Sequence, residues 1–243
     1  MIHLFALLSL LLCGVCYTGF QNSSHFHNTS NRRSLLLLVF GGALLLRLLL
    51  AYTTHGFSND IACFAAWADR IFTLGPGQFY SAEMFTDYPP GFMYVLYLIG
   101  ALRSLLQIPY YSDLHILLLK LPAILCDIAC GFLLYREAVK RLHFSDLQGI
   151  FAASAYLFQP AVILNSSCWG QVDSVYTLMI ILMCLFLMKG NLLPAYAVYG
   201  LGVLLKPQML IFTPVLLTGI WDHVFLQDFS WRKFFYNLCG GLV

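Results

Sequence analysis

Long apolar runs separated by short polar breaks dominate the sequence. Several of these runs approach the roughly 20 residues that a helix needs to cross a bilayer. The expected spans are Ser34–Tyr52, Leu114–Tyr135, Gly149–Ser167, Val175–Met188, Leu192–Leu205 and Met209–Trp221. Gln159 and Pro160 interrupt the third of them. The pattern predicts an all-α fold, a polytopic bundle of transmembrane helices.

The longest polar break begins at His55-Gly56-Phe57-Ser58-Asn59-Asp60. Ser58 and Asn59 are good N-cap residues and Gly75-Pro76-Gly77 is a stop signal, so a helix is expected from Asp60 to about Leu74. We expect this helix to lie in the membrane interface, with the Trp67 ring at the level of the lipid headgroups. The sequence thus predicts an external loop that carries interfacial helices.

Positively charged loops set the expected orientation, because cytoplasmic loops are enriched in Lys and Arg. These loops are Arg32-Arg33, Arg136 to Arg141, Lys189 and Arg232-Lys233. Placing them in the cytoplasm puts Asp60, Asp173 and Lys206 on the external side. This requires Pro89–Asp113 to turn back, and we expect a re-entrant or interfacial helical hairpin there. Arg47, near the end of its span, is expected to snorkel to the interface.

Composition supports a membrane protein and excludes some functions. Hydrophobic residues make up 60% of the chain, charged residues 10%, and the mean hydropathy is +0.78. A soluble domain would be about a quarter charged. The net charge of +2, without a basic cluster, argues against nucleic-acid binding. Most of the eight cysteines stand in apolar runs and are interpreted as buried structural thiols.

Two parts are expected to differ in organisation: residues 1–34, an N-terminal apolar segment with a polar linker, and residues 35–243, a transmembrane module. Met1–Phe20 fits either a signal peptide or a span. Sequons at Asn22 and Asn28 favour an external linker, whereas Arg32-Arg33 favour a cytoplasmic one. The apolar run from Phe234 is only about half a span, so the chain is expected to be part of a longer protein.

Ionisable residues in or beside spans are costly and are usually functional or paired. On the external side the sequence offers Asp60, Asp87, Lys120, Asp173 and Lys206. Asp60 is either a general base for a hydroxyl group or a first-turn acid favoured by the helix dipole. Lys206 either binds a phosphate as a point charge or snorkels. Lys120, seven residues before Asp127, either forms an ion pair within its helix or contacts a substrate.

Further candidates have simpler readings beside the functional ones. Trp169 and Gln171 fit stacking on a sugar and hydrogen bonding to it, although Trp at a membrane interface is common. The segment Asp87-Tyr88-Pro89-Pro90 fits the wall of a pocket, or a rigid turn that starts a helix. The histidines show no ligand spacing, so no metal cage is indicated.

Several segments together resemble a known family. They are Ser58-Asn59-Asp60-Ile61, Phe79-Tyr80, Asp87-Tyr88-Pro89-Pro90-Gly91-Phe92-Met93-Tyr94, Trp169-Gly170-Gln171-Val172-Asp173-Ser174 and Lys206-Pro207-Gln208. In this order they are similar to the membrane-embedded glycosyltransferases of the GT-C class, particularly mannosyltransferases related to the GPI mannosyltransferases. The resemblance covers about Leu35 to Pro214.

The resemblance implies a hexosyltransferase that inverts the sugar it transfers, with mannose as the expected sugar. The donor would be a polyprenyl-phosphate sugar such as dolichyl-phosphate mannose. The acceptor would be a hydroxyl of a glycolipid, glycan or protein at the lumenal or extracytoplasmic face. The enzyme would be a multi-pass protein of the endoplasmic reticulum membrane or the bacterial inner membrane.

The resemblance also assigns roles to residues. Asp60 matches the catalytic base of the first external loop. Donor phosphate or sugar would be bound by Lys206, Gln208, Lys120, Trp169, Gln171 and Asp173.

Two departures from the family pattern limit what the resemblance implies. Family members are longer than this chain. The resemblance therefore does not say whether this stretch is active by itself. Ile61 stands where many relatives carry a second acid, which leaves the use of a divalent metal open. The alternative reading is a secondary transporter or lipid-binding membrane protein that uses the same acids, and a third is a structural membrane subunit without a site.

Overall fold

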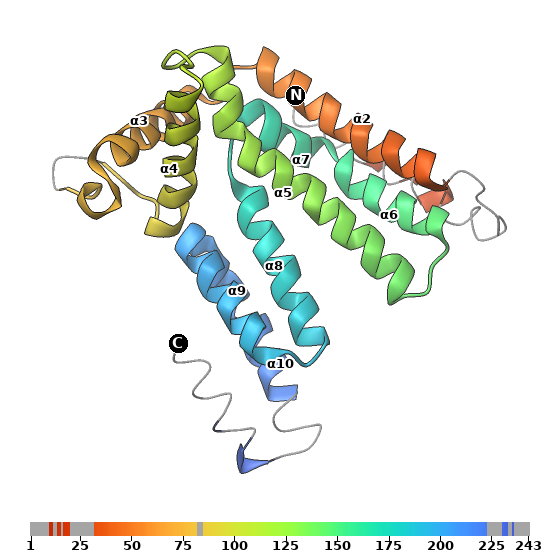
Figure 1. The fold of residues 1–243 in the computed structure, drawn as a ribbon. Helices are drawn as coiled ribbons and strands as arrows, with labels where there is room; N and C mark the ends of the chain where they lie inside the picture. The colour runs from red at the N-terminus through yellow and green to blue at the C-terminus, as the bar shows by residue number, and fades with distance from the viewer. Residues whose placement is uncertain are drawn as a thin grey trace. The chain divides into compact units, whose positions relative to one another are not determined.

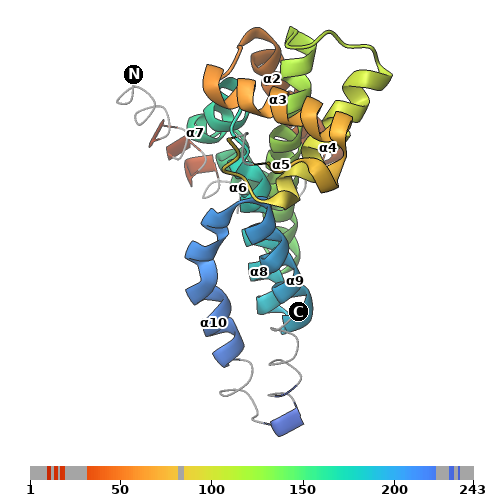
Figure 2. The ribbon, with the colours of Figure 1, turned by 90° about the vertical axis from the view of Figure 1, so that its left-hand side faces the viewer.

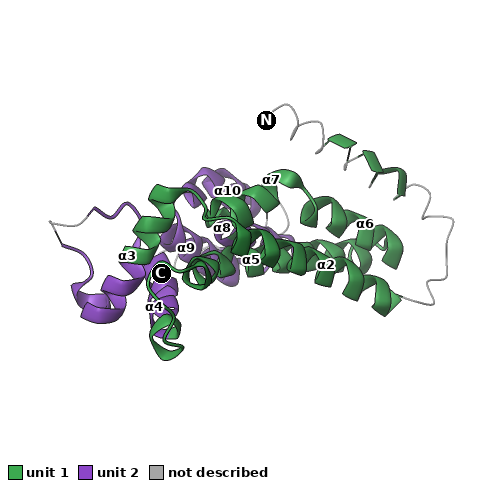
Figure 3. Ribbon diagram, turned by 90° about the horizontal axis from the view of Figure 1, so that it is seen from above, with its two compact units in different colours: residues 1–66, 102–174 green, residues 67–101, 175–243 purple. Residues whose placement is uncertain are grey.

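The computed structural model describes residues 10–11, 14–15, 17–19, 32–81, 85–222, 230–232 and 235. Within these residues the secondary structure is helical and contains no strand, which confirms the all-α prediction. The chain divides into two compact units (Figure 3). Unit 1 comprises Met1–Ala66 and Leu102–Ser174, and unit 2 comprises Trp67–Ala101 and Val175–Val243.

Unit 1 is built around α5 (Asp113–Lys140), against which α2 (Arg32–Thr53) and α6 (Asp146–Leu157) pack (Figure 1). Side-chain caps start two of these helices: the Ser112 hydroxyl accepts from the amide of His115, and Ser145 forms a capping box with Gln148. One apolar core cluster of the unit consists of Ala43, Tyr135, Ile150, Ala153 and Leu157.

The third expected span is broken where the sequence predicts. After α6, Pro160 begins α7 (Pro160–Ile163), which continues into the π-helical η2 (Leu164–Trp169). The two halves are bent by 51°. A proline lacks the N–H that would continue the hydrogen-bond ladder of α6, so the axis changes direction here.

The polar break forms α3 (Ser58–Leu74), followed by η1 (Pro76–Gln78). The helix begins two residues before the expected start and ends as predicted, with Gly75 at a φ of 82°. One expectation is wrong: Trp67 is only 3% exposed and its indole donates to Phe85 O at 3.1 Å. The apolar face of α3 buries this ring within the protein.

The expected hairpin at Pro89–Asp113 is also wrong. The stretch forms one helix, α4 (Pro90–Leu105), followed by a turn that leads to the Ser112 cap of α5. Pro90 stands at the first helical position, and the apolar residues after it include no proline and no polar break before Arg103. Nothing in that run favours a reversal, so the helix continues.

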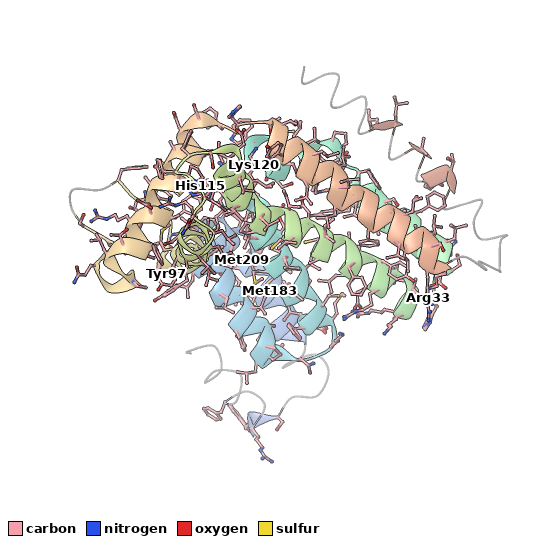
Figure 4. All side chains as sticks on the ribbon, turned by 45° about the horizontal axis from the view of Figure 1, so that its top comes forward. Arg33, Tyr97, His115, Lys120, Met183 and Met209 are labelled. Carbon is pink, nitrogen blue, oxygen red and sulfur yellow. The ribbon has the colours of Figure 1, made fainter. Side chains whose placement is uncertain are left out.

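Unit 2 contains the rest of α8 (Asp173–Met188), α9 (Leu192–Leu205), η3 (Pro207–Phe212) and α10 (Thr213–Trp221). The three α-helices run side by side in Figure 2. Their core consists of Met183, Ala195, Met209 and Leu216, and Figure 4 labels the two methionines. The bounds of α9 are those expected from the sequence, whereas the last expected span begins with the 3-10 turn η3.

Among the described residues, two helices, α2 and α5, are long and apolar enough to cross a membrane, and the bent pair of α6 with α7–η2 is a third if it is one span. Helices α4, α8, α9 and the segment Pro207–Trp221 are apolar but shorter. Most of residues 1–31 and the apolar run from Phe234 lie outside the described residues, as do both sequons. The expected division between the N-terminal segment, residues 1–34, and the transmembrane module, residues 35–243, stays a prediction.

Candidate functional site

Three of the predicted site residues meet in unit 1. The Asp60 carboxylate, in the first turn of α3, accepts a hydrogen bond on Oδ2 from Trp169 Nε1 at 3.2 Å. The same oxygen accepts a short hydrogen bond from Gln171 Nε2. Within the described part of the chain, Oδ1 accepts no hydrogen bond. The carboxylate is therefore oriented by two donors and keeps one oxygen available to a further hydroxyl group.

The turn after η2 brings these donors to Asp60. Asn165 O accepts from the amides of Gly170 at 3.1 Å and Gln171 at 2.9 Å, which closes the end of the π-helical segment. Gly170 has a φ of 88°, and a Cβ placed there would lie 2.6 Å from Ile61 Cδ1. Glycine meets both requirements, the left-handed backbone and the close approach of α3.

The loop before α3 is bound to the same turn. Phe57 N donates to Trp169 O at 2.8 Å, and the rings of these residues lie 5.3 Å apart with an interplanar angle of 37°. Both side chains are about half exposed, Phe57 at 44% and Trp169 at 51%. An open aromatic pair therefore lies beside the Asp60 carboxylate, an arrangement that can cover an apolar face of a bound molecule while the carboxylate accepts a hydroxyl.

Asp173, the first residue of α8, lies close to this turn. Asn165 Nδ2 donates to Asp173 Oδ2 at 2.9 Å. Sequence reasoning did not single out Asn165, Phe57 or Thr54. The polar sequence Asn165-Ser166-Ser167 at the end of an apolar span was the available signal for the first of them.

Lys120 lies beneath the loop that leads to Asp60, on the N-terminal half of α5 (Figure 4). Its side chain is 0% exposed, and its ammonium donates to Ala51 O at 3.2 Å, Thr54 O at 2.6 Å and Thr54 Oγ1 at 3.1 Å. An ammonium has three donors, and these three contacts use them. The ion pair within α5, one of the two interpretations of Lys120, is not formed, since Asp127 contacts other groups.

Arg47 and Asp127 form a buried ion pair between α2 and α5. Arg47 Nε lies 3.2 Å from Asp127 Oδ2, and both side chains are 0% exposed. Arg47 also donates to Leu157 O at 2.7 Å, one of the carbonyls left without a helical partner where α6 ends. The expected snorkelling of Arg47 is therefore wrong: neighbouring helices supply acceptors that make contact with the interface unnecessary.

Asp127 also holds both ends of the segment that carries Trp169 and Gln171. Ser166 Oγ donates to its Oδ2 at 2.6 Å and Ser174 Oγ donates to its Oδ1 at 2.5 Å. Tyr156 OH is a further donor to Oδ1, at 3.3 Å. A buried charge satisfied by an ion pair and several hydrogen bonds fixes its neighbours in one arrangement.

Lys206 and Tyr88 come together in unit 2. Lys206 ends α9, is 8% exposed, and has its ammonium 5.7 Å from the ring centroids of Tyr88 and Tyr176. These are cation–π distances. Gln208, in η3, is exposed.

The segment Asp87-Tyr88-Pro89-Pro90 is the turn that starts α4. Tyr88 packs between the rings of Trp67 and Phe92, at 5.8 and 5.4 Å, and Tyr80 OH donates to its carbonyl at 3.0 Å. Partial burial raises the pKa of the Tyr80 hydroxyl. A phenol is protonated at neutral pH even without this shift, so the group can donate. Asp87 is exposed and makes no hydrogen bond to a described residue. The rigid-turn interpretation fits this geometry.

Among the described residues, no group of three or more His, Cys, Asp or Glu side chains is arranged to hold a metal ion. No protein-family model matches the chain, and no match is found among curated proteins.

Proposed function

We propose that the protein is a membrane hexosyltransferase that moves a sugar from a polyprenyl-phosphate carrier to an acceptor hydroxyl, with Asp60 as general base. The observation that carries this proposal is the Asp60 carboxylate, oriented on Oδ2 by Trp169 and Gln171 while Oδ1 stays open. An enzyme that activates a hydroxyl needs a carboxylate held in one orientation beside its substrate. The resemblance of the surrounding motifs to the GT-C class supports the same reaction.

In the proposed reaction, the acceptor hydroxyl attacks the anomeric carbon of the sugar while Asp60 Oδ1 takes its proton. A new glycosidic bond forms as the bond between the anomeric carbon and the carrier phosphate breaks. The phosphate leaves with the bonding electrons. One displacement inverts the anomeric configuration, and no covalent enzyme intermediate is required.

The open aromatic pair of Phe57 and Trp169 is proposed to cover one face of a sugar ring next to the base. The role of Lys206 in binding the donor phosphate, suggested by its place in the sequence, stays a prediction. The roles of Gln208 and Asp173 in donor binding, and mannose as the sugar, stay predictions. So does the location in the endoplasmic reticulum membrane or the bacterial inner membrane.

A transfer assay tests this function. Membranes that contain the protein are incubated with radiolabelled dolichyl- or undecaprenyl-phosphate sugars, and label is followed into glycolipid, glycan and protein fractions. We expect label to enter one of these fractions with the wild type and not with an empty-vector membrane. Equal labelling of the two membranes with every donor would contradict the proposal.

The transporter alternative needs acids that exchange protons or cations within the membrane. Asp127, the fully buried acid of unit 1, instead accepts from Arg47, Ser166, Ser174 and Tyr156. Its oxygens are occupied by fixed donors, which suits a structural ion pair better than a proton relay.

A further inference from the structure

We propose that Lys120 is a positioning residue of the candidate site, which caps the end of α2 and holds the loop leading to Asp60 against the turn carrying Trp169 and Gln171. The inference replaces the phosphate-binding role that the sequence suggested for this lysine. Its kinetic test rests on the proposed transferase function, whereas its structural test does not.

The ammonium group caps α2. The last carbonyls of a helix have no partner within it, and the helix dipole places partial negative charge there. Lys120 Nζ donates to Ala51 O in the last turn and to Thr54 O just beyond it. A lysine reaching the end of another helix thus satisfies two carbonyls that would otherwise be buried without a donor.

Thr54 places this cap beside η2. Its hydroxyl receives a hydrogen bond from Lys120 at 3.1 Å and donates to Leu50 O at 2.6 Å, and it lies 3.3 Å from Ser167 O. The lysine stem passes close to the turn as well, since a Cβ built on Gly170 would lie 3.4 Å from Lys120 Cε. One side chain therefore bonds to the loop before α3 and lies close to the turn that carries Gly170.

The burial of this cation indicates that its position matters. Removing an ammonium from water is costly, and within the described residues no carboxylate lies within 4.0 Å of Lys120. Backbone carbonyls and one hydroxyl provide its compensation. A lysine that binds a phosphate needs a donor directed away from the protein. The three contacts of the Lys120 ammonium leave no such donor.

Amide hydrogen exchange provides a test that needs no activity. In Lys120→Met, we expect exchange to rise about tenfold or more at Phe57 and Gly170, whose amides bond to Trp169 O and Asn165 O. Exchange in α9 should stay unchanged. Lys140→Met, at the exposed end of the same helix, is the matched control and should exchange as the wild type does.

Donor kinetics separate positioning from phosphate binding. If Lys120 positions Asp60, Lys120→Met lowers kcat by about 10- to 100-fold and leaves the KM for the lipid-phosphate donor within about twofold. Lys120→Arg does not restore kcat, because the larger head group has no room at a fully buried position. A phosphate ligand predicts the reverse, a raised donor KM that arginine restores.

Thr54→Val keeps the test decisive if Lys120→Met fails to fold. It removes the hydroxyl between Lys120 and Ser167 O and leaves the carbonyl of Thr54 in place, so a smaller rise in exchange at the same two amides is expected. Unchanged exchange at Phe57 and Gly170 in the folded variants would overturn the inference. If no sugar transfer is found with any donor, the proposed function fails, and the exchange result still decides the role of Lys120.

Discussion

Trp169 Nε1 donates to Asp60 Oδ2 at 3.2 Å across 109 positions of sequence. The contact joins the start of α3 to the turn after η2, and Gln171 adds a second hydrogen bond to the same oxygen. Two donors on one oxygen fix the plane of the carboxylate and direct the other oxygen elsewhere. The proposed base is thus held by residues of a second segment, whose own position depends on Asp127 and Lys120.

Removing either donor is expected to lower the rate without unfolding the protein. A hydrogen bond to a charged group contributes about 1.5–3 kcal/mol, so Gln171→Ala should lower kcat/KM by roughly 10- to 100-fold. Trp169→Phe keeps a ring against Phe57 and removes only the indole donor, so a similar loss is expected. The measurement is steady-state transfer with each variant. Trp221→Phe, at an exposed position of unit 2, is the matched control.

The buried pair of Arg47 and Asp127 should matter for stability. Breaking a buried ion pair by removing one partner costs about 3–5 kcal/mol, because the other charge stays buried and uncompensated. We expect Arg47→Met and Asp127→Leu each to lower the unfolding midpoint strongly in detergent. The double variant should be destabilised by less than the sum of the single variants. Additive effects would show that the two charges do not depend on each other.

The sequence predicts the helices well because hydropathy and length determine them. The bounds of α9 are those of an uninterrupted apolar run, and the bend before Pro160 follows from the missing amide of proline. The hairpin at Pro89–Asp113 was expected only from charge bias and length. The local sequence after Pro90 continues as a helix, and this local preference prevailed.

The pairing of buried charges could not be predicted from spacing along one helix. Lys120 and Asp127 share a face of α5, but each bonds to groups outside that helix. Their partners Thr54 and Arg47 lie 66 and 80 positions away in the sequence, and only the packing of α2 on α5 brings them together. The same holds for the site: Asp60, Trp169 and Gln171 were each candidates, whereas their contact depends on the fold.

Two glycines with positive φ test how closely the site segments must approach. A Cβ at Gly56 would lie 2.7 Å from Trp169 O, and one at Gly170 would lie 2.6 Å from Ile61 Cδ1. Gly75 has a similar φ, 82°, but a Cβ built there would meet no neighbouring atom within 4 Å. At its φ of 82° and ψ of 158°, Gly75→Ala should therefore cost backbone strain alone, about 1–3 kcal/mol.

In Gly56→Ala and Gly170→Ala, a steric clash adds to this strain, so both variants should unfold at lower temperature than Gly75→Ala and lose transfer activity. Thermal unfolding in detergent and the transfer assay are the measurements. Equal effects of all three changes would show that the loop before α3 and the turn after η2 can move apart without loss of stability or activity.

The most direct measurement is sugar transfer by Asp60→Asn in comparison with Asp69→Asn, a change on the same helix. Asparagine keeps the size of the side chain and removes the carboxylate that takes the proton. We predict that Asp60→Asn folds and inserts as the wild type does but transfers no detectable sugar, while Asp69→Asn keeps its activity. Wild-type transfer by Asp60→Asn would contradict the assignment of Asp60 as the base.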